Sequence, residues 1–286
     1  MLGQKFSVTK VPPGHFYSPI PDKSELIRRK DEIWPQGLLS ATGIDFNDES
    51  HLAILETVFP RYFSRYDYPD TGTSDEHLTY FYTNNSQFSW LDSRSLFVLL
   101  QHWKPQRVVE VGSGYSTLLI TDVNHRFLDR SMEVHCIEPY PRPFMHALED
   151  RVKLMSTPVQ NLGAEYFAFL EAGDILFIDS THVCKTGSDV AHLFLNVIPQ
   201  LKPGVKVHVH DIFLPDNYPF TWVTDLDLHW NEQYVLQVLL QNRHRYRVLF
   251  GANYAHLRFP EKVSRAIGVP DGQGYGGGSI WFEVIQ

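Results

Sequence analysis

From about Asp92 to its end, the chain alternates short apolar segments with longer segments whose apolar residues recur at helical spacing. The expected strands are RVVEV (107–111), EVHCIE (133–138), RVKLMS (151–156), DILFID (174–179), VKVHVH (205–210), RYRVLF (245–250) and a last strand in GGGSIWFEVI (276–285). Helices are expected over residues 93–103, 115–127, 143–150, 164–170, 188–201 and 231–241. The glycine-rich GYGGG (274–278) predicts a hairpin turn before the last strand. Strands that alternate with helices predict an α/β fold with a mainly parallel, doubly wound sheet.

The first part of the chain has a different composition. Residues 1–91 are rich in Pro, Tyr, Phe and Asp, and they contain the helical segments KSELIRRKDEIW and HLAILETVF. The segment from Pro12 to Asp22 holds too many prolines for a helix or a central strand. We therefore divide the chain into a leader and cap, residues 1–91, and a main domain, residues 92–286.

The composition argues against several classes of partner. The chain has 286 residues, 43% of them hydrophobic, and a formal net charge of -8 without a block of Lys and Arg, so a basic face for nucleic acid is not expected. No segment is apolar and long enough to span a bilayer, and the N-terminus lacks an apolar signal-peptide core. The two cysteines, Cys136 and Cys184, suit reduced thiols. These features predict a cytoplasmic protein without a membrane partner, and they are compatible with a homo-oligomer.

The turn after the first expected strand, GSGYST (112–117), has two glycines of a dinucleotide fingerprint, but Thr117 stands in place of the third. Ligands of a doubly wound sheet bind beyond the carboxyl ends of its strands. Acids stand at these ends here: Glu110, Glu138, Asp179 and Asp211. Acids suit a cationic or hydroxyl-rich ligand better than a pyrophosphate, and Glu138 is placed to bind both hydroxyls of a ribose. A ribose joined to a positively charged group predicts S-adenosylmethionine.

Several motifs resemble those of class I S-adenosylmethionine-dependent methyltransferases. VVEVGSGYST (108–117) is similar to their first motif, IEP (137–139) to their second and DILFIDS (174–180) to their fourth. The chain further resembles a bacterial small-molecule methyltransferase group with the blocks GHFYSPIPD (14–22), IDSTHVCKTGSDV (178–190), HDIFLPDNYP (210–219) and WNEQY (230–234). The resemblance spans nearly the whole chain. It implies a Rossmann-like, seven-stranded methyltransferase sheet with a helical or irregular N-terminal cap, and S-adenosylmethionine as the cofactor.

The resemblance also implies roles for individual residues. Near the methionine part of the cofactor it places Gly112, Ser113, Gly114, Tyr115 and Ser116, with Glu110 close to the amino group. Glu138, followed by Pro139, would bind the ribose. The family holds the adenine after the third strand, where the usual acid is absent here and Gln160 or Asn161 must serve. Asp179 and Ser180 would lie beside the methyl group.

Methyl transfer needs a positioned nucleophile and a group that removes its proton. We predict that His182 is the general base, and that His210 and Asp211 orient the acceptor or the imidazole. Tyr17 in the leader is a further catalytic candidate, because leaders of this kind can close a site. Two other residues have structural explanations. His208, in mid-strand, is expected to be a hydrogen-bonded core residue, and Glu232 to favour a helix start through the helix dipole.

A bound divalent metal is the less favoured alternative for this step. Catechol-type methyltransferases bind magnesium through an acid after the fourth strand and an Asp-Asn pair after the fifth. Asp179 and Asp211 match the two acids, but Ile212 stands where the asparagine should be. The metal candidates are Asp179, His182, His210 and Asp211. Imidazole ligands favour a softer metal than magnesium.

The sequence thus predicts methyl transfer from S-adenosylmethionine to an O or N atom of a small molecule. Two alternatives stay open. The first is a non-catalytic sensor of S-adenosylmethionine or S-adenosylhomocysteine, and the second is a cyclase that uses the sulfonium for another displacement. A sensor has no need of His182, His210 and Asp211 beside the methyl group, so these residues favour an enzyme.

Overall fold

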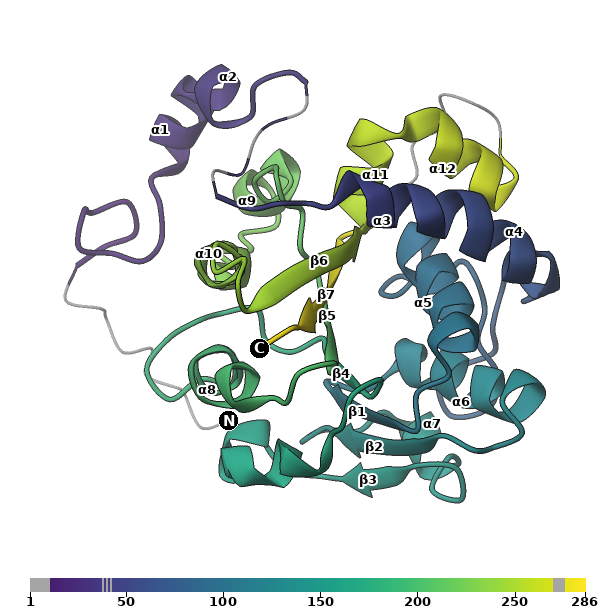
Figure 1. Ribbon diagram of the computed structural model, residues 1–286. Helices are drawn as coiled ribbons and strands as arrows, with labels where there is room; N and C mark the ends of the chain where they lie inside the picture. The colour runs from purple at the N-terminus through teal and green to yellow at the C-terminus, as the bar shows by residue number, and fades with distance from the viewer. Residues whose placement is uncertain (1–10, 38, 40, 42, 270–275) are drawn as a thin grey trace.

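Seven strands form one sheet in the order β3-β2-β1-β4-β5-β7-β6 (Figure 1). The computed structural model describes residues 11–37, 39, 41, 43–269 and 276–286. The strands are β1 (Arg107–Val111), β2 (Glu133–Ile137), β3 (Lys153–Met155), β4 (Ile175–Ile178), β5 (Lys206–His210), β6 (Tyr246–Gly251) and β7 (Ser279–Val284). Neighbouring strands from β3 to β5 are parallel, whereas β7 is antiparallel to β5 and β6. The predicted α/β fold with a doubly wound, Rossmann-like sheet is confirmed.

Apolar residues at successive strand positions bury the sheet on both faces. In β1, Val108 belongs to one hydrophobic core, and Val109 and Val111 belong to the other. The first core is shared with α4 (Phe59–Tyr62), α5 (Trp90–Trp103), α6 (Tyr115–Phe127), α7 (Pro143–His146) and α12 (Pro260–Ile267). The second is shared with α8 (Asp189–His192) and α10 (Glu232–Leu240), while α11 (Ala252–Arg258) contributes to both. This arrangement leaves the carboxyl ends of β1, β2, β4 and β5 uncovered by either layer of helices.

Some helices differ from their expected form. Residues 164–170 form a 3-10 helix, Ala164–Phe169, rather than an α-helix. The helix expected over 188–201 divides into α8, a π-helix (Leu193–Val197) and a 3-10 helix (Ile198–Gln200). Pro199 lacks the backbone N–H that an α-helix requires, which accounts for the irregular end. The predicted hairpin turn is wrong because α11 and α12 lie between β6 and β7, and Gly274 and Tyr275 of the glycine run lie outside the described residues.

The N-terminal part of the chain packs on the main domain in two places. Beside α9 (Phe220–Thr224) lie α1 (Lys23–Arg28) and α2 (Lys30–Ile33), and here Trp34 Nε1 donates to the Tyr218 carbonyl at 2.8 Å. Further along, α3 (Asp48–Ala53) packs on β6, where His51 Nε2 accepts from the Gly251 N–H at 2.8 Å. Side chains between residues 54 and 88 also join the first core of the sheet. The division of the chain into a leader and cap (1–91) and a main domain (92–286) stays a prediction.

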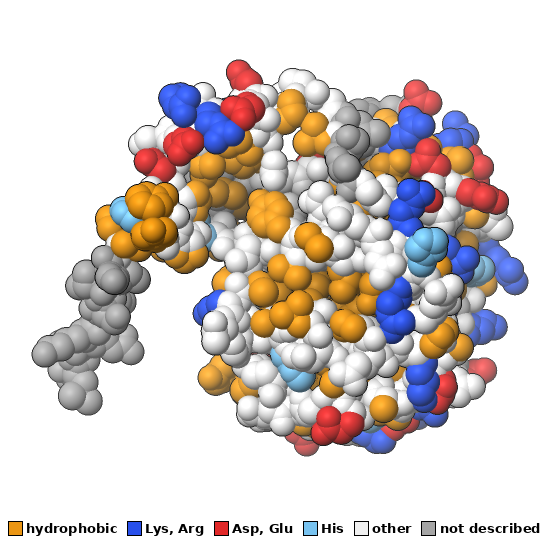
Figure 2. All heavy atoms as spheres, turned by 60° about the vertical axis from the view of Figure 1, so that its left-hand side comes forward, with side chains coloured by type: hydrophobic (Ala, Val, Ile, Leu, Met, Phe, Trp, Pro, Cys, Tyr) orange, Lys and Arg blue, Asp and Glu red, His pale blue; other side chains and the backbone are white. Residues whose placement is uncertain are grey.

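One face of the molecule is unusually apolar. Hydrophobic side chains gather on the side that carries α8 and α10 (Figure 2), and the exposed ones include Leu195, Tyr234 and Val238. No helix in the described part of the chain is apolar and long enough to cross a membrane. The oligomeric state stays a prediction.

Asp174, just before β4, joins the start of that strand to the start of β1. Its carboxylate accepts from the Arg107 N–H, from Arg107 Nη1 and from the Glu171 N–H, each at 2.9 Å. The side chain is buried, so these donors have no ready substitute.

We expect Asp174→Ala to lower the free energy of unfolding by about 2–4 kcal/mol, because it leaves two backbone donors and a partly buried guanidinium without their acceptor. Urea unfolding followed by circular dichroism measures this change. Asp150→Ala, at an exposed carboxylate, should change the free energy by less than about 0.5 kcal/mol. Equal midpoints for the two variants would contradict the expected role of Asp174.

Candidate active site

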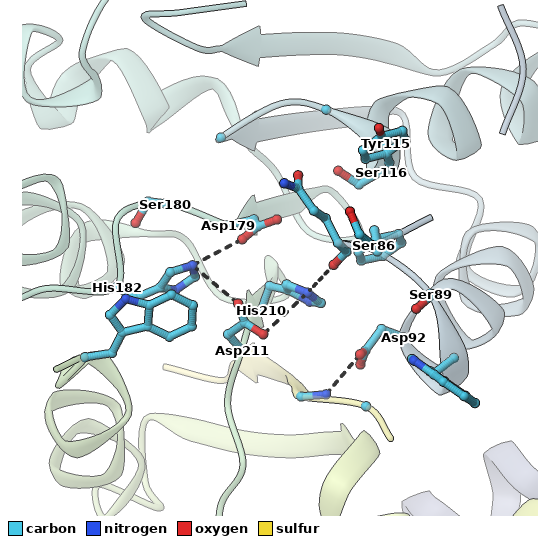
Figure 3. Close-up of a pocket in the computed structure, with 18 of the residues that line it drawn as sticks. Ser86, Ser89, Asp92, Tyr115, Ser116, Asp179, Ser180, His182, His210 and Asp211 are labelled. Atoms are coloured by element: carbon cyan, nitrogen blue, oxygen red, sulfur yellow. Dashed lines mark hydrogen bonds and ion pairs between the residues drawn. The ribbon is translucent and has the colours of Figure 1, made fainter. Parts of the chain in front are cut away.

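A cleft of about 860 Å³ lies at the carboxyl ends of the parallel strands (Figure 3). Segments after β1, β2, β4 and β5 line it, together with residues from 86–92, 213–230 and 276–278. Eleven residues that the sequence singled out line this one cleft: Gly112, Ser113, Gly114, Tyr115, Ser116, Glu138, Asp179, Ser180, His182, His210 and Asp211. They meet because parallel strands bring their carboxyl ends to the same edge of the sheet.

Gly112 allows the turn after β1 to pass directly over the end of β4. Its φ is +81°, and a Cβ at this position would lie 1.6 Å from the Asp179 carbonyl oxygen. Any larger residue would therefore push the two strand ends apart. The hydroxyls of Ser113 and Ser180, on either side of this contact, are buried and have no partner in the described protein.

Glu138 stands at the end of β2 and faces the same turn. One carboxylate oxygen accepts from the Tyr140 N–H at 2.8 Å, and the other accepts from the Ser113 N–H at 3.3 Å. A carboxylate has about four acceptor sites, so both oxygens keep capacity for hydroxyl donors of a ligand. The backbone contacts fix the orientation of the carboxylate before a ligand arrives.

Three residues predicted to contact the cofactor lie outside the cleft lining. Glu110 is fully buried and accepts from Ser116 Oγ at 2.7 Å and Thr117 Oγ1 at 2.5 Å, so its carboxylate braces the turn from behind instead of meeting an amino group. Burial raises its pKa to about 7. Pro139 and Gln160 are absent from the lining, and Gln160 points to solvent from a short 3-10 helix, Val159–Asn161.

His182 lies among three carboxylates. Its Nδ1 is 2.9 Å from Glu232 Oε2, and its Nε2 is 3.5 Å from both Asp179 Oδ1 and Asp211 Oδ2 (Figure 3). Burial alone would lower the pKa of His182, but the hydrogen bond and charge of Glu232, with Asp179 and Asp211, raise it. The Glu232 side chain is fully buried and serves this histidine, so its expected explanation by the helix dipole is incomplete.

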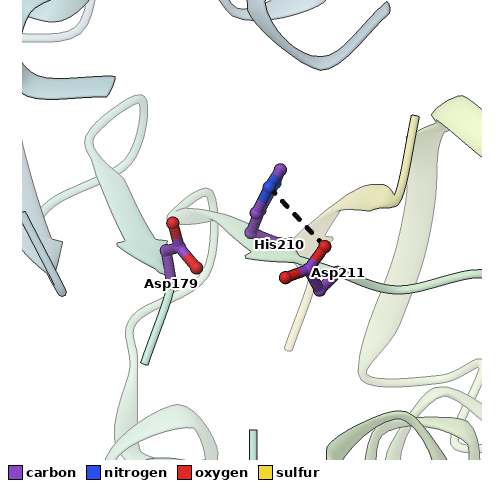
Figure 4. A group of neighbouring side chains, drawn as sticks. All are labelled: Asp179, His210 and Asp211. Carbon is purple, nitrogen blue, oxygen red and sulfur yellow. Dashed lines mark ion pairs between the residues drawn. The ribbon is translucent and has the colours of Figure 1, made fainter. Parts of the chain in front are cut away.

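His210 completes the cluster from the end of β5. Its Nε2 lies 3.3 Å from the Gln87 carbonyl oxygen and 3.8 Å from Asp211 Oδ1, and the ring stands beside the carboxylates of Asp179 and Asp211 (Figure 4). Burial alone would lower the pKa of His210, but these two carboxylates and Asp92 raise it to about 9. Asp179, His210 and Asp211 each offer a ligand atom within 4.8 Å of the others. Such an O,N,O set can hold a proton or a divalent metal.

The backbone is strained at the points that present these groups. Positive φ values occur at His182 (60°), Asp211 (53°) and Trp90 (53°), all of which line the cleft. For residues with a Cβ this conformation is costly and persists only where other contacts impose it. At His182 the carbonyl accepts the N–H groups of Asn231 and Glu232 at the start of α10. These bonds hold the strained loop in place.

Two further expectations about side chains are wrong. Tyr17 is 76% exposed and does not line the cleft, because the leader is docked at α9 by Trp34 and by the ion pair of Lys23 with Asp227. His208 is buried as expected, but neither of its ring nitrogens has a hydrogen-bond partner among the described residues. Its ring stacks on Phe177 with a centroid distance of 4.0 Å.

The sequence missed several lining residues. Those on distant segments are Ser86, Gln87, Ser89, Asp92, Arg142, Phe213, Trp222, Trp230 and Gly276 to Gly278. Asp92 accepts from the Gly278 N–H at 2.9 Å and so ties α5 to the start of β7. Phe213, Trp230 and Gly276 to Gly278 belong to the blocks HDIFLPDNYP, WNEQY and GYGGG, but these patterns did not indicate a place in the cleft, and no local motif marks the other residues. The only available signal was the density of tryptophan between positions 222 and 230.

Part of the chain is similar to known protein sequences. A family model described as a methyltransferase domain matches residues 109–212, from the middle of β1 to just past β5. An uncharacterized protein of Archaeoglobus fulgidus is 38% identical over 164 residues, which cover 56% of this chain and 73% of that protein.

Two solved structures are similar in fold. A Podospora anserina methyltransferase bound to S-adenosylhomocysteine is 14% identical, with a TM-score of 0.43, over 98% of this chain and 100% of that one. A Bacillus cereus O-methyltransferase in complex with S-adenosylhomocysteine is 12% identical, with a TM-score of 0.39, over 84% and 98% of the two chains.

We expect Glu232→Gln to lower the pKa of His182 by about one unit or more. A hydrogen bond to a charged group contributes about 1.5–3 kcal/mol, and one pKa unit equals about 1.4 kcal/mol. Proton NMR titration of the histidine rings measures the pKa, with His182→Asn to assign the signal. Glu149→Gln is the control, since Glu149 pairs with the exposed His146. An unchanged His182 pKa in Glu232→Gln would refute this account of its charge.

Proposed function

We propose that the chain, whose residues 109–212 match a methyltransferase domain, is a class I S-adenosylmethionine-dependent methyltransferase and methylates an O or N atom of a small molecule bound in the cleft. One observation carries this proposal. The glycine turn and Glu138 open into the same cleft as His182, which lies 3.5 Å from two carboxylates at neighbouring strand ends. This arrangement supports a cofactor subsite beside a proton-accepting group.

The turn after β1 suits S-adenosylmethionine in shape and in hydrogen-bonding capacity. Gly112 adds no side chain to the turn, which therefore lies close over the end of β4 and presents its backbone to the cleft. Glu138 is oriented to accept from two ribose hydroxyls. The carboxylates of Asp179 and Asp211 favour positive charge at the inner end of the cleft. When bound, the cofactor supplies an electrophilic methyl on a sulfonium, so the protein's part is orientation and proton removal.

His182 is the proposed general base, acting through Nε2. Glu232 holds Nδ1 at 2.9 Å, which fixes the ring with Nε2 directed toward the cleft. The three surrounding carboxylates favour the protonated imidazole and so raise the pKa of His182. A positive charge bound beside Asp179 lowers that pKa. Nε2 is then free to accept a proton from the acceptor atom, with Asp211 and His210 orienting the acceptor.

A divalent metal is a second candidate for activating the acceptor. Asp179, His210 and Asp211 can converge on one ion, whereas His182 lies outside that group and Ile212 is buried in the second core. A metal on His210 must displace its proton, so binding would weaken as the pH falls below about 9. The ion would hold an acceptor oxygen next to the methyl group and lower its pKa.

A sensor, a methyltransferase and a cyclase would leave different products of the cofactor. A sensor binds S-adenosylmethionine and releases it unchanged. Methyl transfer yields S-adenosylhomocysteine, and an intramolecular displacement yields methylthioadenosine. Mass spectrometry of the nucleoside product, after incubation with a panel of amines and phenols, separates the three.

We expect Glu138→Ala to weaken binding of S-adenosylhomocysteine by about 100-fold or more, because two charge-assisted hydrogen bonds of about 1.5–3 kcal/mol each are lost. Isothermal titration calorimetry measures the affinity. Glu165→Ala, at an exposed glutamate outside the cleft, should bind like wild type. No binding to wild type at millimolar concentration would overturn the proposed function, and a wild-type affinity in Glu138→Ala would remove Glu138 from the cofactor site.

We expect His182→Ala to lower turnover by about 100- to 10,000-fold, the usual cost of losing a general base, with little change in S-adenosylhomocysteine affinity. Turnover is followed as S-adenosylhomocysteine released in the presence of an accepted substrate. His146→Ala, at an exposed histidine, is the control. Metal content is measured on the same proteins. Near-normal turnover would shift the role to His210 and Asp211, and inhibition of wild type by chelators would favour the metal.

A further inference from the structure

Three aromatic side chains from the segment after β5 line one part of the cleft. Phe213, Trp222 and Trp230 all line it. The Phe213 and Trp222 rings meet at 82° with centroids 5.1 Å apart, and the Trp222 and Trp230 rings meet at 84° with centroids 5.4 Å apart. Successive rings that stand nearly at right angles form a corner rather than a stack. We call these three residues the aromatic corner.

The aromatic corner adjoins the carboxylate cluster. The Trp230 ring lies 4.2 Å from the His182 ring, centroid to centroid, and His182 Nε2 lies 3.5 Å from Asp179 and Asp211. One imidazole therefore separates the corner from two acids. A molecule that fills the corner has its polar end within reach of those acids.

Four carboxylates line the cleft, and the imidazoles of His182 and His210, whose pKa values are raised, offset part of their negative charge. Asp92, Glu138, Asp179 and Asp211 contribute carboxylates. Within the described chain, Arg142 is the only Lys or Arg side chain of the lining, and it is committed to Asp75 at 3.0 Å and to Gln87 at 2.6 Å. A phenolate or carboxylate acceptor would meet repulsion here, whereas a cation would be attracted both by the acids and by the aromatic ring faces.

We propose that the methyl acceptor is an amine, and that it enters as an alkylammonium ion bound between the aromatic corner and the Asp179–Asp211 carboxylates. This inference rests on the proposed function and narrows its acceptor to nitrogen. Aromatic rings arranged around a cavity are the recurrent means of binding substituted ammonium groups, since each ring face presents negative charge. The acids add attraction that is not available to a neutral molecule of the same shape.

The ammonium, His182 and the cofactor sulfonium together account for every proton and electron pair in the proposed transfer. The ammonium gives one proton to His182 Nε2, which leaves a lone pair on nitrogen. That pair forms the new C–N bond as the S–CH3 bond breaks, and the electrons of the broken bond stay on sulfur. The nitrogen regains a positive charge and the sulfur becomes a neutral thioether. The product is a more substituted ammonium ion, which the aromatic corner also suits, so its departure limits how tightly the corner can bind.

Binding of choline tests the inference without the cofactor and without turnover. Choline carries a quaternary ammonium, and 3,3-dimethylbutan-1-ol has the same shape without the charge. Calorimetry on the wild-type protein should show choline binding at least about 10-fold more tightly than the alcohol. Trp222→Leu should weaken choline binding by about 5- to 30-fold, and Trp222→Tyr should restore part of it.

A matched variant and a second ligand separate the possible failures. Trp103→Leu changes a tryptophan of α5 that packs on Trp281 outside the cleft, and it should leave choline binding unchanged. Trp222→Leu should retain wild-type affinity for S-adenosylhomocysteine. If S-adenosylhomocysteine binds but choline and the alcohol bind equally, the ammonium site is refuted and the proposed function stands. Preferential methylation of a phenol over amines in a substrate panel would also refute the ammonium site. Failure of S-adenosylhomocysteine to bind the wild type would refute the proposed function itself.

Discussion

The contact between Gly112 and the Asp179 carbonyl is the constraint on which the candidate site depends. A Cβ at position 112 would come within 1.6 Å of that oxygen, so the ends of β1 and β4 can approach only over a glycine. Asp179 N in turn donates to the Val111 carbonyl at 2.8 Å. This junction sets the separation between the turn that faces Glu138 and the loop that presents His182. The proposed cofactor subsite and the acid cluster are therefore held by the same junction between β1 and β4.

Electrostatics then connects the site to the fold around it. Glu232 is fully buried and Asp179 and Asp211 lie nearby, so His182 is retained in the interior as the partner of three acids. Burial of so many carboxylates is costly unless positive charge compensates them. His182 and His210 supply part of that compensation, since both have raised pKa values. The cleft is thus built to receive further positive charge from its ligands.

The same loops also bear backbone strain. His182 and Asp211 have positive φ values, and the N-terminal end of α10 holds the first of them through hydrogen bonds to its carbonyl. The bonds at α10 depend on its packing in the second core through Leu236 and Leu240. Core packing on one face of the sheet thereby offsets the backbone strain of a loop at its edge. The strained backbone directs the His182 and Asp211 side chains into the same cleft.

The sequence by itself determined the sheet, its two-layer covering and the acids at its strand ends. Those features follow from local apolar patterning and from the rule that parallel strands share a carboxyl edge, which is why Glu138, Asp179 and His182 could be placed together. Only the tertiary structure decided that Glu110 turns inward, that Tyr17 faces solvent and that Glu232 reaches His182 from 50 positions away. It alone brought Asp92, Trp222 and Trp230 to the cleft. These outcomes depend on long-range packing of loops and helix ends, where neither periodicity nor strand register fixes the direction of a side chain.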